Sequence, residues 1–142
     1  KKEGRDPNLA KGVEITNTQI FPFENRRMPY LLLHELSHAY HDQVLGFNHP
    51  EVNAAFEKAC DSKTYDEVKR FNGRSTELDK AYAMTNSKEY FAEVTEAFFG
   101  KNDYFPFTRD DLEKHDPTAC EMLEKVWGVP KKANPPASAN NR

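Results

Sequence analysis

Apolar and polar residues recur with a period of 3.6 along residues 29–45, which predicts an amphipathic helix. Its two stripes consist of Leu32, Leu36, Ala39 and Gln43, and of His34, His38, His41 and Leu45. Pro29 suits a first helical turn, and Gly46 suits the position just after a helix. We therefore expect one continuous helix that ends before Gly46.

Further helices and a hairpin are predicted by capping residues and turn signals. One helix is expected over residues 50–61, and another over 87–99 after a cap at Asn86. A third helix follows the possible capping box Thr108–Asp111, and a fourth runs from Asp116-Pro117 to Gly128. The expected strands are 20–23, and 65–71 joined to 74–78 through the turn Asn72-Gly73. The sequence thus predicts an α+β fold, mostly helical, in a single domain over residues 1–130. A tail over residues 131–142, rich in Asn, Pro, Ala and Ser, is expected to be disordered.

Composition narrows the class of partner. The chain has 142 residues and a net charge of −3, and it shows no basic stripe, so nucleic acid is not an expected partner. No apolar run reaches the roughly 20 residues of a membrane span. We expect a monomer that acts on a peptide or protein. The start at Lys1-Lys2-Glu3 suggests a processed product or an excised domain. Cys60 and Cys120 fit either a disulfide or two free thiols. The cysteines therefore leave the cellular compartment open, and we slightly favour secretion.

The run His34-Glu35-Leu36-Ser37-His38 carries the clearest chemical signal. Residues four apart lie above one another on a helix, so His34 and His38 can reach one zinc ion. Glu35 then lies where a metalloprotease keeps its general base. The alternative is a helix whose imidazoles are solvated or satisfied in the core, and the intervening glutamate favours the metal.

A catalytic zinc site needs a third protein ligand. His41 lies about 10 Å from His34 along a helix axis, too far to share the ion, so we interpret it as a supporting, substrate-facing or exposed residue. Glu89, Glu93 and Glu96 form an acidic stripe on a strongly apolar predicted helix, where unpaired carboxylates are costly. We assign Glu89 to the metal and Glu93 to the free N–H of a ligating imidazole, with the reverse order as the alternative. A solvated acidic face is the other possibility.

At these two segments the chain resembles the gluzincin metallopeptidases, in particular the catalytic domain of the anthrax lethal factor-like family. The run from His34 to Asp42 is similar to that family's active-site helix, and Asn86-Ser87-Lys88-Glu89-Tyr90-Phe91-Ala92-Glu93 to its zinc-glutamate helix. The resemblance covers roughly residues 29–100 and is faint between the two helices. It implies a zincin-like fold, Glu89 as third ligand and Tyr82 as active-site tyrosine. Without the resemblance, Tyr82 would be an ordinary half-buried strand aromatic.

These residues together predict a zinc metalloendopeptidase in which Glu35 and Tyr82 are catalytic. An edge strand within residues 13–23 is expected to pair with the extended substrate. The alternatives are a zinc-binding peptide-interaction module, a degenerate peptidase without turnover, and a helical partner-binding domain with an accidental motif.

Overall fold

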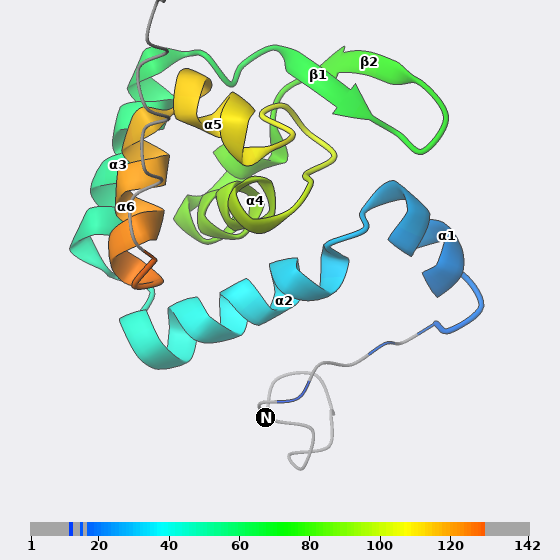
Figure 1. Ribbon diagram of the computed structural model, residues 1–142, viewed down its shortest axis with the longest axis horizontal. Coiled ribbons are helices and arrows are strands. Elements are labelled where there is room, and N and C mark those ends of the chain that lie inside the picture. The colour runs from blue at the N-terminus through cyan, green and yellow to red at the C-terminus, as the bar shows by residue number, and fades with distance from the viewer. Residues whose placement is uncertain (1–11, 13–14, 16, 130–142) are drawn as a thin grey trace, which may run out of the picture.

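The computed structural model describes residues 12, 15 and 17–129 and combines many helices with one antiparallel strand pair, which confirms the α+β, mostly helical class (Figure 1). The elements are α1 (Phe21–Arg27), α2 (Leu31–Tyr40), the π-helical turn η2 (His41–Leu45), α3 (Pro50–Ser62), β1 (Val68–Phe71), β2 (Thr76–Asp79), the 3₁₀ turn η3 (Tyr82–Thr85), α4 (Ser87–Phe99), α5 (Arg109–His115) and α6 (Pro117–Val126). The tail predicted over residues 131–142 lies outside the described residues.

Helix α4 lies at the centre of the fold. Figure 1 shows it nearly end-on, with α2 along one side and α3 and α6 along another. Nine of its 13 residues are buried, including both Glu93 and Glu96. Because α2 packs directly on α4, the histidine stripe of one helix faces the acidic stripe of the other.

The start of α4 follows the predicted cap. The Asn86 side chain accepts hydrogen bonds from the backbone N–H groups of Lys88 (2.9 Å) and Glu89 (3.1 Å). These bonds satisfy two of the four unpaired donors of a helix N-terminus. The cap therefore fixes the first turn, which carries Glu89.

Two predicted segments differ from the structure. Residues 20–23 were expected to form a strand, but α1 begins at Phe21, because Pro22 suits a first helical turn. An edge strand that pairs with substrate was expected within residues 13–23. The continuous described part of that segment, residues 17–23, contains no strand. The α-helix predicted to run to Leu45 instead ends as α2 at Tyr40, and the chain continues to Leu45 as the π-helical turn η2. The 3.6-residue pattern does not distinguish these hydrogen-bonding registers.

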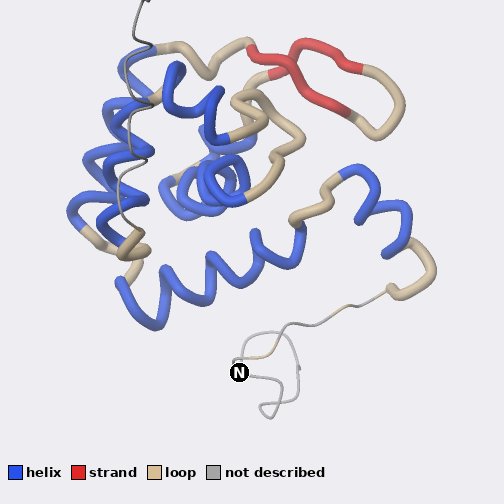
Figure 2. The backbone as a smooth tube through the Cα atoms, in the orientation of Figure 1, coloured by secondary structure: helices blue, strands red, loops and turns tan. Residues whose placement is uncertain are grey.

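The hairpin agrees with its turn signal. Strands β1 and β2 pair antiparallel, with Phe71 opposite Thr76, and they form the one sheet of the described residues (Figure 2). Asn72 and Gly73 begin the connecting turn, where Gly73 has a φ of 93°. Strand β1 begins at Val68 rather than residue 65, because Tyr65 lies in the preceding turn.

Two further expectations can be compared with the fold. Cys60 and Cys120 are both free thiols, so the disulfide alternative is not realised. Among the described helices, each is too short or too polar to cross a membrane.

Candidate metal centre

Helices α2 and α4 bring three possible metal ligands to one point. The Nε2 atoms of His34 and His38 lie 3.1 Å apart. The Oε2 atom of Glu89 lies 3.2 Å from Nε2 of His34 and 3.3 Å from Nε2 of His38. The three predicted ligand residues therefore present one atom each at the corners of a nearly equilateral triangle.

This triangle fits a zinc ion. Tetrahedral coordination at about 2.0–2.1 Å places neighbouring ligand atoms about 3.3 Å apart. The observed spacings of 3.1–3.3 Å agree with one face of such a tetrahedron. Two imidazoles and one carboxylate also match the donor set of catalytic rather than closed structural zinc sites, which leaves the fourth position to water or substrate.

Glu96 holds His34 in the orientation that ligation requires. The Nδ1 atom of His34 donates to Oε1 of Glu96 at 2.7 Å, whereas Oε1 of Glu93 lies 3.8 Å away. Donation from Nδ1 leaves the lone pair of Nε2 free for a metal. The contact predicted for Glu93 is thus made by the residue one helical turn further on, and Glu93 instead accepts a hydrogen bond from Asn102 at 2.9 Å.

The carboxylates also decide which imidazole carries a charge. Burial alone would lower the pKa of His34, but the hydrogen bond to Glu96 and the charges of Glu96, Glu93 and Glu89 raise it to about 9. Burial and the charge of His34 lower the pKa of His38. Burial and the neighbouring Glu96 raise the pKa of Glu93 to about 8. A cluster of carboxyl groups around one histidine favours a bound cation, which would stabilise their ionised forms.

Glu35 and Tyr82 lie on a cavity that His34, one of the three candidate ligands, also lines. This cavity, which we call the metal-side cavity, has a volume of about 280 Å³, and its wall includes Arg27, His34, Glu35, Tyr82, Glu93 and Asp103. Tyr82 lies in the turn η3 rather than in a strand, and its side chain is half exposed. The charge of Glu89 and partial burial raise the pKa of Tyr82, which keeps its hydroxyl protonated and able to donate.

His41 is not exposed and does not face a substrate. Its side chain is fully buried in η2, and its ring packs against Phe47 and Phe91 at centroid distances of 5.2 and 4.8 Å. Neither ring nitrogen has a hydrogen-bond partner among the described residues. Burial and the charges of neighbouring cationic groups lower the pKa of His41 to about 4. It lies outside the ligand triangle, as its distance along the helix predicts.

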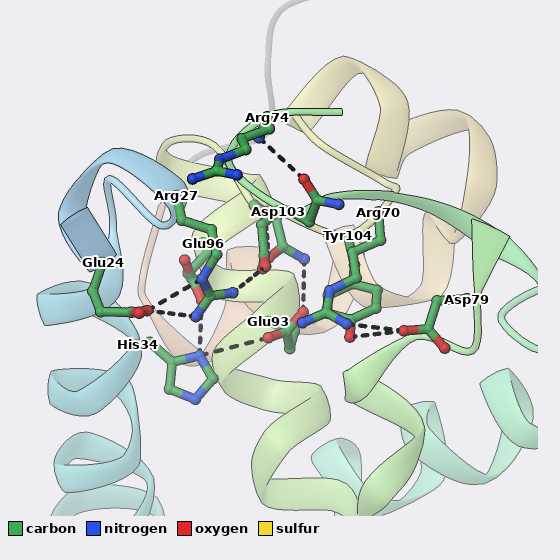
Figure 3. Close-up of polar contacts among 12 residues, drawn as sticks. Glu24, Arg27, His34, Arg70, Arg74, Asp79, Glu93, Glu96, Asp103 and Tyr104 are labelled. Atoms are coloured by element: carbon green, nitrogen blue, oxygen red, sulfur yellow. Dashed lines mark hydrogen bonds and ion pairs between the residues drawn. The ribbon is translucent and has the colours of Figure 1, made fainter. Parts of the chain in front are cut away.

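A polar network behind the ligands was not predicted. Figure 3 shows Arg27 between Glu24 and Asp103, close to the carboxylates that surround His34. Arg27 binds Glu24 at 2.8 Å and Asp103 at 2.7 Å. Asp103 follows Arg27 by 76 positions, so no local pattern connects them. Glu96 could have been found from its place in the acidic stripe.

No significant match to this chain was found among protein-family models, curated proteins or solved structures.

Proposed function

We propose that this chain is a zinc-dependent metallopeptidase of the gluzincin type, with a zincin-like domain similar to that of the lethal factor-like family. The observation that carries the proposal is the triangle of His34, His38 and Glu89, whose atoms are spaced for one tetrahedral ion. Two independent features support it: the hydrogen bond that orients His34, and the cavity shared by Glu35 and Tyr82.

In this proposal each residue of the site has one task. His34, His38 and Glu89 would hold the ion, which when bound lowers the pKa of water to about 7 and polarises a carbonyl group. Glu35 takes a proton from a water molecule as the oxygen of that water attacks the scissile carbonyl carbon. As the C–N bond breaks, Glu35 delivers that proton to the nitrogen of the leaving amine. The protonated hydroxyl of Tyr82 donates to the oxyanion of the tetrahedral intermediate.

The test combines zinc content with hydrolysis of a mixed peptide library. We expect one zinc per natural chain and cleavage detected by mass spectrometry. Glu35→Gln should keep the zinc and lose at least about a hundredfold in rate, because the general base is removed. Glu89→Gln should lose zinc, and the exposed Glu57→Gln on α3 is the matched control that should change neither property.

Two results would contradict the proposal. Bound zinc without cleavage by any form would favour the zinc-binding interaction module. Cleavage that is equally fast in Glu35→Gln would remove Glu35 from the reaction.

A further inference from the structure

A second cavity lies between α1 and the turn that joins β1 to β2, two segments that Figure 1 shows beside each other. Its volume is about 300 Å³, and it is lined by Phe23, Arg26, Arg27, Gly73 and Arg74, which we call the arginine pocket. Three of its five residues carry a guanidinium group, and no acidic residue lines it. On a chain of net charge −3, this is a local concentration of positive charge.

Two of the three guanidinium groups are not neutralised by the described part of the chain. Arg27 is compensated by Glu24 and Asp103. Arg26 donates weakly to the carbonyl oxygen of Pro22 at 3.4 Å, and neither Arg26 nor Arg74 forms an ion pair with a described residue. Within the described part of the chain, the pocket therefore presents about two cations without an ion-pair partner.

The backbone turn and the side chain of Arg27 are held in place. The Asn72 side chain accepts hydrogen bonds from the backbone N–H groups of Arg74 and Ser75, both at 3.0 Å, which fixes the turn. Gly73 lies against the aliphatic stem of Arg27, whose Cβ would be 3.6 Å from a Cβ added to the glycine. Figure 3 shows Arg74 beside Arg27, whose own ion pairs anchor it from the other side. The floor of the pocket, formed by the turn and Arg27, is thus organised before a ligand arrives.

We propose that the arginine pocket binds an acidic side chain of the peptide substrate, away from the scissile bond. Guanidinium groups recognise carboxylates through paired N–H donors, and the half-exposed ring of Phe23 offers an apolar wall for the methylene groups of Glu. Arg27 lines both this pocket and the metal-side cavity, so the two cavities adjoin at this side chain. In this proposal, a peptide that extends from the candidate metal centre past Arg27 would reach the arginine pocket. This inference rests on the proposed peptidase function.

The first test measures binding without turnover. In the full chain carrying Glu35→Gln and loaded with zinc, we would compare a fluorescein-labelled alanine-based peptide containing consecutive Glu residues with its Gln counterpart. Fluorescence anisotropy should give about tenfold tighter binding of the Glu peptide, as expected for a charge-assisted pair of hydrogen bonds. The preference should shrink between about 50 and about 300 mM salt.

The variants locate that preference. Arg26→Gln with Arg74→Gln should abolish it, whereas Lys114→Gln, an exposed lysine on α5, should leave it unchanged. Equal binding of the two peptides, or a Glu preference that survives in the double variant, would overturn the proposal. Inorganic phosphate that binds the natural chain but not the double variant, with no preference for the Glu peptide, would assign the pocket to a small free anion and also overturn it.

A second readout separates this inference from the proposed function. In the mixed peptide library, the natural chain should cut peptides with an acidic residue on one side of the cut faster than their amide counterparts, and the double variant should not discriminate. Cleavage without that discrimination would reject the pocket and keep the peptidase. A Glu preference in binding without any cleavage would keep the pocket as a peptide site and reject the peptidase.

Discussion

At the scale of single residues, the two nitrogens of His34 have separate partners: Nδ1 contacts Glu96 and Nε2 contacts Glu89. Because Nδ1 donates to Glu96 at 2.7 Å, Nε2 is the nitrogen left to bind a metal once it has lost its proton. We predict that Glu96→Gln lowers zinc affinity about 10- to 100-fold, since the uncharged amide holds the imidazole less firmly and makes it less basic. Competition with a chromophoric chelator would measure this change.

Glu93→Gln is the matched control for that prediction. Glu93 is equally buried on the same helix, and a glutamine there can still accept the hydrogen bond from Asn102. We expect a smaller loss of zinc affinity than in Glu96→Gln. A larger loss in Glu93→Gln would restore the arrangement that the sequence suggested, with Glu93 as the partner of the imidazole.

His41 makes a different contribution at this scale, because it is a buried base without a hydrogen-bond partner among the described residues. Its pKa is lowered to about 4, so the unfolded chain binds its proton more readily than the folded protein. Stability is therefore lost as the pH falls from about 6.5 towards about 4. We predict that His41→Leu gains roughly 2–3 kcal/mol over the natural chain at about pH 4.5 relative to pH 7.

Urea unfolding of both chains across this pH range, with chelator present, would test the prediction. His115, whose pKa is also lowered by burial, is present in both chains, so its own acid response cancels in the difference. If the free energy of unfolding of the two chains changed in parallel with pH, the prediction would be wrong. His41 would then take up its proton in the folded protein as easily as in the unfolded chain.

At the scale of elements, the cap of α4 connects local sequence to the metal centre. The Asn86 side chain holds the backbone N–H of Glu89, the residue that supplies the carboxylate of the triangle. We predict that Asn86→Ala costs about 1 kcal/mol of stability and also weakens zinc binding, whereas Asn86→Asp keeps both. Thr108→Ala, which removes the cap of α5, should cost similar stability without changing zinc affinity. Denaturant unfolding and zinc titration of the three variants would decide, and equal zinc affinity in all of them would separate the cap from the site.

The caps also explain which elements were predictable. Helix caps are local signals, because they act within a few residues of the helix end. Asn86 and the capping box from Thr108 to Asp111 accept hydrogen bonds from backbone N–H groups at helix starts, and Gly46 follows the end of a helix. Helix α1 was predicted as a strand because Ile20–Phe23 is a short apolar run without a period, and such a run fits either state. The π-helical turn η2 was missed because an i→i+5 register leaves no mark in the side-chain pattern.

At the scale of the whole molecule, the site depends on contacts between residues far apart in the chain. The spacing of His34 and His38 predicts that they can share an ion, and the acidic stripe predicts that a carboxylate meets them. Which carboxylate meets which nitrogen depends on how α2 packs on α4, and Glu96 rather than Glu93 reaches Nδ1 for that reason. The contact of Arg27 with Asp103 and the arginine pocket likewise follow from packing of α1 and the hairpin, which no short motif encodes.

Metal binding should therefore stabilise the fold as a whole, because the triangle joins α2 to α4, the helix at its centre. Zinc that binds only the folded chain adds about 2.7 kcal/mol at a hundredfold excess over its Kd. We predict that a chelator lowers the unfolding midpoint, that zinc restores it, and that magnesium does not, because two of the three donors are imidazole nitrogens. In Glu89→Gln the zinc-dependent shift should disappear, while Glu57→Gln should retain it. Thermal unfolding at several zinc concentrations would test this, and a midpoint that zinc leaves unchanged in the natural chain would mean that the three side chains do not act together as ligands.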